Sequence, residues 1–351
     1  MNASDRPPLR LTQFSHGGGC GCKIAPAMLQ QIIAKAGRSA IPKALLVGIE
    51  TADDAAVYQL NERQAIVATT DFFMPIVDDP HDFGAIAATN AISDIYAMGG
   101  TPLFALALVG MPVDKLPLDT IRRILDGGEA VCATAGIPVA GGHTIDSVEP
   151  IYGLVVIGIV DPRHLKRNAG ARPGDRLILG KPLGIGIYSA ALRKERLSPQ
   201  GYAAMLASAT QLNTPGIAFG AFPAVHALTD VTGFGLLGHL LEMCRASKVG
   251  ATIEASGIPL LPGVLELARE GIATGASGRN WAGYGQDVDL GPGDRAVERV
   301  LLTDPQTSGG LLVACAADGA EAVLGIFREQ GFEHAAVIGE ITQGVPRVSV
   351  R

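Results

Sequence analysis

The sequence predicts an α/β protein made of α+β layers and divided into two domains. Its 351 residues are too many for one core of ordinary size. Short runs rich in valine, isoleucine and leucine alternate with segments of helical periodicity in both halves of the chain. The 45 glycines and the aromatic content of only 5% indicate a core of small aliphatic side chains joined by glycine-rich loops.

In the first half, a short helix and three strands are expected before a strongly apolar helix. Pro26 suits the first turn of the short helix, and Gly37 suits its C-terminal cap. Polar, turn-forming residues separate the second strand from the third. The predicted elements are a helix over 26–36, strands over 45–49, 55–60 and 65–70, a helix over 83–98, a strand over 102–109, a helix over 118–136 and a strand over 151–160.

The segment 161–173 has four basic residues and no apolar periodicity, so we expect it to link the domains. The predicted elements after it are a strand over 176–179, helices over 185–195 and 199–212, strands over 224–228, 300–302 and 311–314, and a helix over 320–330. We expect a mobile glycine-rich segment with the first helix over 1–44, an N-terminal domain over 45–161 and a C-terminal α+β domain over 174–351.

Charge and hydropathy narrow the classes of partner. A formal net charge of −6 argues against nucleic acid, although a single nucleotide carried by a divalent metal is compatible with it. The first residues lack the apolar region of a signal peptide, and the longest apolar run, 151–160, is too short to span a bilayer. We therefore expect no membrane partner and a cytoplasmic location, where the five cysteines would remain thiols.

The segment His-Gly-Gly-Gly-Cys-Gly-Cys-Lys over 16–23 is expected to be a mobile loop, because glycine loses the most backbone entropy on ordering. His16 and Lys23 lie close enough in sequence to favour the thiolate form of Cys20, so a reactive thiol is the preferred interpretation. Half of a zinc site would lack its other ligands, and a disulfide between Cys20 and Cys22 would close a strained ring. A plain flexible tail remains the alternative.

Acidic residues follow the predicted strands at positions that a buried sheet does not favour. Asp53 and Asp54 run directly into an apolar strand, and adjacent carboxylates repel each other unless a cation or donors compensate. Asp71 ends another strand. Asp94 lies inside an apolar helix, four residues after Asn90 and on the same face. Any one of these acids alone would be a turn or cap residue, but together they indicate a metal site.

Glycine turns supply the other candidate sites. The turn over 141–144 offers backbone N–H groups and a hydroxyl to a phosphate or ribose, although an ordinary turn is the alternative. The segment 229–238 contains a literal G-x-G-x-x-G, with Glu254 at a tolerable distance for a dinucleotide site; the carboxylate of Asp230 instead favours a turn that holds magnesium. The glycines of 174–182 have the wrong spacing for a P-loop.

Seven segments between residues 11 and 310 together resemble the selenophosphate synthetase (selenide, water dikinase) family. They are LTQFSHGGGCGCKI, ETADDAAVY, TTDFFMPIVD, NAISDIYAMGG, AGGHTID, LTDVTGFGLLGH and DPQTSGG. The resemblance implies conversion of ATP, selenide and water into selenophosphate, AMP and orthophosphate, for selenocysteine and selenouridine formation. It also implies a fold similar to the aminoimidazole ribonucleotide synthetase superfamily, in which the N-terminal domain binds ATP and Mg²⁺ and pairs strands across a homodimer.

Carried over residue by residue, the resemblance makes Cys20 and Lys23 catalytic. It implies that the magnesium ligands are Asp54, Asp94 and Asp230. The nucleotide contacts that it implies are Lys23, Thr51, Ala52, Asp53, Asp71, Asp94, Gly142, His143 and Thr144. A selenium-delivery protein is a further candidate partner.

Two other classes remain as alternatives. An ATP-dependent enzyme of the same superfamily, acting on aminoimidazole ribonucleotide or thiamine phosphate, would need no Cys-x-Cys-Lys loop. A redox or metal-trafficking protein that uses the two thiols would have no use for the distributed acids and glycine turns. Selenide-dependent consumption of ATP, with AMP as a product, separates all three.

Overall fold

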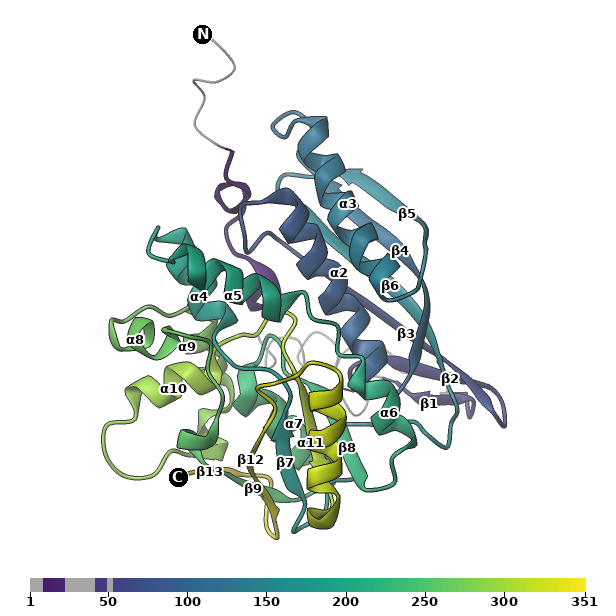
Figure 1. Ribbon diagram of the computed structural model, residues 1–351, viewed down its shortest axis with the longest axis vertical. Helices are drawn as coiled ribbons and strands as arrows, with labels where there is room; N and C mark the ends of the chain where they lie inside the picture. The colour runs from purple at the N-terminus through teal and green to yellow at the C-terminus, as the bar shows by residue number, and fades with distance from the viewer. Residues whose placement is uncertain (1–8, 23–41, 49–52) are drawn as a thin grey trace.

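The computed structural model describes residues 9–22, 42–48 and 53–351. Two mixed layers of sheet and helix lie against each other, with the N-terminal layer in blue and the C-terminal layer in green and yellow (Figure 1). The predicted α/β class and its α+β layers are thereby confirmed. The predicted helix over 26–36 lies outside the described residues.

The N-terminal sheet has six strands in the order β1-β2-β3-β6-β4-β5. Its bounds are β1 Leu45–Val47, β2 Ala56–Asn61, β3 Gln64–Phe73, β4 Thr101–Met111, β5 Val139–Asp146 and β6 Ile151–Val160. The strand β6 lies between β3 and β4, which explains its continuous apolar sequence. The strands β4 and β5 are parallel, so the chain must cross over between them, and helix α3 (Leu118–Thr134) makes that crossover.

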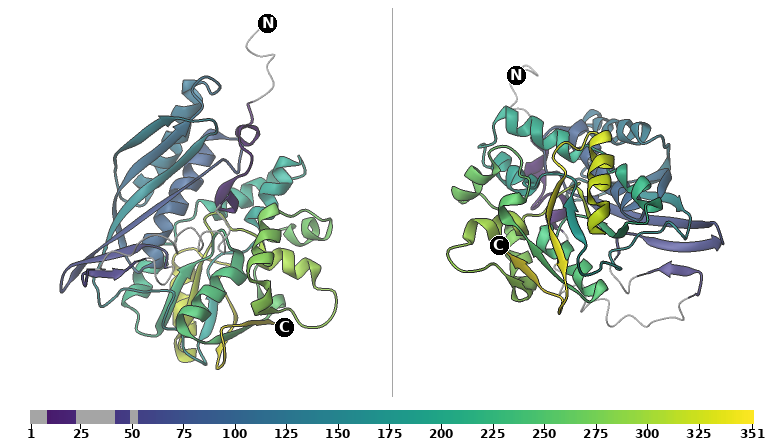
Figure 2. Two further views of the ribbon diagram at one scale, coloured as in Figure 1. Left: turned by 180° about the vertical axis from the view of Figure 1, so that it is seen from behind. Right: turned by 60° about the horizontal axis from the view of Figure 1, so that its bottom comes forward.

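Helices α2 (Pro80–Ala97) and α3 cover one face of this sheet, and the turned view shows the strands on the other side (Figure 2). Helix α2 begins where the Asp79 carboxylate accepts a hydrogen bond from the backbone N–H of Asp82 at 3.0 Å, with Pro80 in the first turn. It ends before Gly99, whose φ of +72° is the left-handed conformation that glycine adopts readily.

Glycine lets α2 and α3 approach closely. A Cβ at Gly84 of α2 would lie 1.8 Å from the carbonyl oxygen of Ile124. A Cβ at Gly127 of α3 would lie 2.0 Å from the carbonyl oxygen of His81. Gly127, which interrupts the helical pattern in the sequence, is therefore required by helix packing. Its neighbour Gly128 makes room for β6, since a Cβ there would lie 2.0 Å from the hydroxyl oxygen of Tyr152.

The C-terminal sheet has seven strands in the order β10-β13-β9-β12-β7-β11-β8. Its bounds are β7 Arg176–Leu179, β8 Val225–Asp230, β9 Gly250–Ile253, β10 Val288–Asp289, β11 Leu311–Cys315, β12 Ala336–Thr342 and β13 Val348–Val350. Strands β7 and β11 are antiparallel, and all their paired residues except Arg176 are buried and apolar. Both strands were predicted from the sequence, over 176–179 and 311–314. No element was predicted from the sequence for 331–351, which forms β12 and β13.

Helices surround this second sheet. Their bounds are α4 Ile185–Arg193, α5 Pro199–Ala209, α6 Pro215–Ala221, α7 Gly235–Ser247, α8 Val264–Arg269, α9 Gly275–Tyr284, α10 Ala296–Thr303 and α11 Ala320–Glu329. The 3₁₀ turns are η2 Leu11–Phe14, η3 Gly19–Cys22, η4 Ala255–Gly257, η5 Gly285–Asp287 and η6 Ala317–Gly319. Among the described residues, no helix has the length and apolarity needed to cross a bilayer.

Two sequence predictions are wrong. Residues 300–302 belong to helix α10 instead of a strand, because Leu301 and Leu302 form the buried stripe of an amphipathic helix whose other face carries Glu298. A three-residue apolar run cannot distinguish the two periods. Residues 141–144 belong to strand β5 instead of a turn.

Strand packing explains the glycines of β5. A Cβ at Gly142 would lie 2.0 Å from the carbonyl oxygen of Ala107 on β4. The glycine therefore permits the backbones of β4 and β5 to pair closely. In the sequence alone, glycines that serve strand pairing cannot be distinguished from glycines that form a flexible turn.

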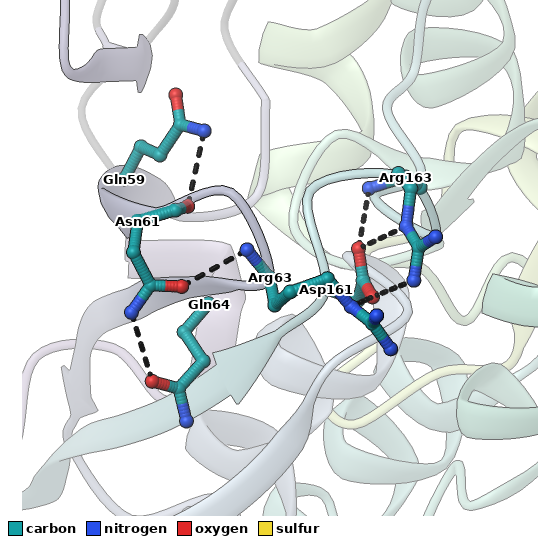
Figure 3. A network of polar contacts seen from close by, with 6 residues as sticks. All are labelled: Gln59, Asn61, Arg63, Gln64, Asp161 and Arg163. Carbon is teal, nitrogen blue, oxygen red and sulfur yellow. Dashed lines mark hydrogen bonds and ion pairs between the residues drawn. The ribbon is translucent and has the colours of Figure 1, made fainter.

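The β2–β3 hairpin is tied to the start of the segment that links the domains (Figure 3). The side-chain oxygen of Asn61 accepts a hydrogen bond from the backbone N–H of Arg63 at 2.9 Å. Arg63 and Arg163 both donate to the carboxylate of Asp161. The Arg163 hydrogen bonds hold the pKa of Asp161 well below its ordinary value, so this carboxylate stays ionised.

The described part of the N-terminal glycine-rich segment, residues 9–22, packs between the domains. Arg10 forms an ion pair with Asp78 of the N-terminal domain at 2.9 Å and another with Glu195 of the C-terminal domain. Thr12 donates its backbone N–H to Asp78 at 3.0 Å. These contacts hold the start of the segment in place, and the mobility predicted for 16–23 stays a prediction.

Replacing Gly84 by Ala should destabilise the protein by about 3 kcal/mol, since the new methyl group overlaps a helix backbone that cannot retreat. Gly325 is also helical, and no atom lies within 4 Å of a Cβ built there. Gly325→Ala should therefore stabilise α11 by up to about 1 kcal/mol. Urea denaturation followed by circular dichroism measures both, and equal effects would contradict this account of the α2–α3 contact.

Candidate functional site

Three carboxylates from both domains meet at the centre of the molecule. Asp54 precedes β2, Asp94 lies on α2, and Asp230 ends β8. One carboxylate oxygen from each lies within 4.8 Å of the other two. The structure thus brings together the three acids that the sequence predicted as a metal site.

Hydroxyl groups orient each carboxylate. Thr229 donates its hydroxyl to Asp54 Oδ1 at 2.8 Å, and Ser93 donates to Asp230 Oδ2 at 2.5 Å. The Thr69 hydroxyl donates to Asp94. Thr229, the sequence neighbour of Asp230, thus holds Asp54, and Ser93, the neighbour of Asp94, holds Asp230. Asp94 is held by a hydroxyl group from strand β3.

The cluster fits a divalent cation. Burial, followed by the nearby charges of Asp230 and Asp94, raises the pKa of Asp54 well above its ordinary value. The buried Oδ2 atom of Asp54 has no hydrogen-bond partner within the described ranges. Mg²⁺ prefers oxygen ligands, and a cation at this point would both use that atom and offset the repulsion.

A buried lysine lies near the cluster. Lys181 is 1% exposed and donates from Nζ to the carbonyl oxygens of Gln211 at 2.6 Å and Ser308 at 3.0 Å. Burial lowers the pKa of its ammonium group to about 7, and the Asp230 carboxylate opposes that change. The sequence offered only a weak signal for it, a lysine between glycine and proline directly after a strand.

Cys20 is the buried end of the N-terminal segment, 1% exposed on η3. Its backbone N–H donates to the hydroxyl of Thr307 at 3.1 Å. Gly19 adopts a φ of +56°, and a Cβ there would lie 2.2 Å from the same hydroxyl oxygen. Glycine before the thiol is therefore needed for both conformation and space.

Asn90 joins the thiol to the acids. Its Oδ1 accepts from Cys20 Sγ at 3.2 Å and from the backbone N–H of Ser308 at 2.7 Å. Its Nδ2 donates to the carboxylate of Asp71. The amide of Asn90, four residues before Asp94 on α2, therefore contacts three groups. They are the thiol, a loop of the C-terminal domain and an acid near the end of β3.

The loop over 304–310 provides the C-terminal side of the thiol site. The Asp304 carboxylate accepts backbone N–H groups from the start of α4, Gly186 at 3.0 Å and Ile187 at 3.2 Å. Burial raises the pKa of Asp304 to about 7. Ser308 has a φ of +57°, which the contacts to Lys181 and Asn90 maintain.

The other predicted site residues divide into three groups. Asp53 accepts the backbone N–H of Asn168 at 2.9 Å, and Asp71 contacts Asn90, so both lie beside the cluster. Lys23, Thr51 and Ala52 lie outside the described residues.

The residues Gly142, His143 and Thr144 lie on the edge strand β5 instead. Strand pairing links Gly142 to Asp71 through Ala107 and Leu154, a separation of three strand spacings or roughly 14 Å. Within this chain, the segment 142–144 therefore lies away from the acids.

Comparison with known proteins identifies the family. The chain matches AIR synthase related protein, N-terminal domain, over residues 52–160 and the C-terminal domain of that family over 172–351. It is 64% identical over 342 residues to a selenide, water dikinase of Dechloromonas aromatica (strain RCB), covering 97% of this chain and 98% of that one. A selenide, water dikinase of Burkholderia pseudomallei (strain K96243) is 63% identical, over 99% and 98% of the two chains. The chain belongs to the selenide, water dikinase family.

Solved structures support the fold of this dikinase family member. Thiamine-monophosphate kinase from Stenotrophomonas maltophilia K279a has a TM-score of 0.64 at 22% identity, covering 94% of this chain and 96% of that chain. The structure described as AaThiL complexed with AMPPCP and TMP has a TM-score of 0.61 at 20% identity, covering 92% and 91%. The predicted likeness to the aminoimidazole ribonucleotide synthetase superfamily is confirmed.

Asp54→Asn should raise the metal-free melting temperature at neutral pH and remove most of the stabilisation by Mg²⁺. Asp54 has a folded-state pKa above its ordinary 3.8, so metal-free stability should fall as pH rises from 3.8 toward the folded value. Mg²⁺ should reverse that loss in the wild type. Thermal unfolding with and without Mg²⁺ is the measurement, with the exposed Asp119→Asn as matched control; an equal Mg²⁺ response in both variants would contradict the metal assignment.

Proposed function

We propose that this protein is a selenide, water dikinase that converts ATP, selenide and water into selenophosphate, AMP and orthophosphate. Relatives of that name, more than 60% identical over nearly the whole chain, support the activity. The observation that carries the proposal is the hydrogen-bonded connection from Cys20 through Asn90 to Asp71, beside the carboxylate cluster. The product would supply activated selenium for selenocysteine and selenouridine formation.

We assign Asp54, Asp94 and Asp230 as ligands of Mg²⁺. The Asp54 oxygen, which has no hydrogen-bond partner among the residues that the structure describes, and the raised pKa of this carboxyl group support the assignment. When bound, Mg²⁺ would offset the negative charge of the polyphosphate during phosphoryl transfer. Asp53 and Asp71 complete the acidic side of the nucleotide site, and we include Lys23, Thr51 and Ala52 in the contact set that the family resemblance implies.

Cys20 is the proposed catalytic thiol. Its position behind a glycine loop keeps bulk water away from the sulfur, and Asn90 orients it toward the acidic side. An oriented, shielded thiol suits a reactive selenium species, which must meet the phosphoryl group before water does. Lys23 would pair with phosphate oxygens, as a lysine ammonium commonly does.

We also propose a homodimer formed through the open face of the N-terminal sheet. Tyr58, Leu60 and Phe72 lie on the face opposite α2 and are 45%, 55% and 51% exposed. Large exposed apolar side chains gathered on one sheet face are typical of an interface. In such a dimer, His143 and Thr144 on the exposed strand β5 would reach a nucleotide held by the partner subunit, which accounts for their distance from the acids of their own chain.

A cytoplasmic location is proposed on the chemistry of the thiols. Cys132, Cys244 and Cys315 are buried and free, and burial raises the pKa of each, to about 11 for Cys132 and Cys315 and to about 12 for Cys244. Such thiols suit a reducing compartment that also supplies ATP.

Cys20→Ser should bind ATP and Mg²⁺ normally and lose at least about a hundredfold in selenide-dependent turnover, because a hydroxyl is a far weaker nucleophile than a thiol. AMP formation with and without selenide measures the activity. Cys132→Ser, at a buried thiol away from the site, is the control for a simple loss of sulfur. Wild-type protein that forms no AMP when selenide is added would overturn the proposed function.

Phe72→Glu should convert the proposed dimer into monomers, because a charge buried in an apolar interface lacks a partner. Leu118→Glu places the same charge on a side chain that is 73% exposed at the start of α3, on the helical side of the sheet, and should leave the dimer intact. Light scattering after size-exclusion chromatography distinguishes the two. Monomeric wild-type protein, or dissociation of both variants, would contradict this interface.

A further inference from the structure

A cavity of about 620 Å³ borders the loop that carries Cys20. Backbone atoms of the loop form one wall through Gly17, Gly18 and Gly21, and Thr307 also lines it. None of the three clustered carboxylates lines this cavity, and neither does any other acidic residue of the described ranges.

The cavity is lined by cationic groups from two helices of the C-terminal domain. Arg193 and Lys194 come from the end of α4, and Arg279 comes from α9. The first turn of α9, beginning with Gly275, also faces the cavity and adds the positive end of its backbone dipole. We call Arg193, Lys194, Arg279 and the glycine wall the cationic chamber.

Both guanidinium groups bind the loop that carries the thiol. Arg193 donates from Nη2 to the carbonyl oxygen of Gly17 at 2.5 Å, and Arg279 donates from Nη2 to that of Gly21 at 2.9 Å. Neither arginine forms an ion pair with a carboxylate in the part of the chain that the structure describes. Each guanidinium has five N–H donors, so most remain available to a ligand in the chamber.

Three carboxylates adjoin residues that line the chamber, and each has a partner. Asp304 accepts the backbone N–H of Gly186 at 3.0 Å. Glu149 pairs with His16 at 2.8 Å, and Glu195 pairs with Arg10. The chamber therefore keeps a net positive potential beside the catalytic thiol. Concave surfaces of one charge sign raise the local concentration of the opposite ion and increase its association rate.

We propose that the cationic chamber binds the anionic selenium substrate and is its route to Cys20, while the nucleotide binds on the acidic side. The proposal rests on the proposed function, because selenide at neutral pH is an anion that the carboxylates would repel. Gly17, Gly18 and Gly21 of the loop that carries the thiol line the chamber and place no side chains between it and Cys20. The two substrates therefore reach the sulfur from opposite sides. The selenium anion approaches through the cationic chamber, and the nucleotide approaches on the acidic side, where the carboxylates attract its metal ion.

Kinetics of a double variant test the chamber. Lys194→Gln with Arg279→Gln should raise the KM for selenide about tenfold at low ionic strength, with the KM for ATP unchanged. Added salt should raise the wild-type KM for selenide and have less effect on the variant. Lys115→Gln removes an exposed charge outside the chamber and is the matched control. An unchanged KM for selenide, or an equal rise in the KM for ATP, would overturn the proposal.

A second measurement does not depend on turnover. Iodoacetate is an anion and iodoacetamide is neutral, so the chamber should favour iodoacetate at Cys20, with the modified residue identified by mass spectrometry. The ratio of the two rates should fall several-fold in the double variant, whereas a general loosening of the loop would raise both rates together. An unaltered ratio, or no labelling of Cys20 by either reagent, would overturn the access route. Failure of selenide-dependent AMP formation with a retained iodoacetate preference would instead count against the proposed function alone.

Discussion

Repulsion among three carboxylates is the interaction on which the centre of this protein depends. Asp54 and Asp94 come from one domain and Asp230 from the other, so the domains meet where like charges are closest. At such separations in a partly desolvated setting, uncompensated charges are strongly unfavourable. Hydroxyl donors lessen the repulsion without removing it, which is why a protonated carboxyl or a bound cation is favoured there.

The side chain of Asn90 transmits that arrangement to the thiol. An amide has both acceptor and donor atoms, and Asn90 uses its acceptor for Cys20 and Ser308 and its donor for Asp71. An aspartate at this position would add a further negative charge beside the cluster, and a hydrophobic residue would leave the Ser308 N–H buried without its acceptor. The geometry of the thiol therefore depends on contacts from both domains.

Different surfaces of the fold carry opposite chemical character. The acidic centre suits a metal-bound nucleotide, the cationic chamber suits an anion, and the open face of the N-terminal sheet is apolar. The glycine loop before Cys20 separates the first two and is thin because it lacks side chains. Such a separation lets two negatively charged substrates approach one thiol without competing for the same groups.

The sequence by itself determined the α/β class and most long elements, because long periodic runs have few alternative explanations. Its acids beside apolar strands indicated a metal site, and the family resemblance selected the three that cluster. Only the tertiary structure decided that Gly142 pairs with β4 and that Leu301 lies on a helix, since short runs and glycines are compatible with several local structures. The positions of Lys181 and Arg279 were likewise decided by tertiary packing. Each side chain donates to a backbone carbonyl oxygen that is distant in sequence, on Ser308 and Gly21 respectively, and no local sequence pattern predicts such contacts.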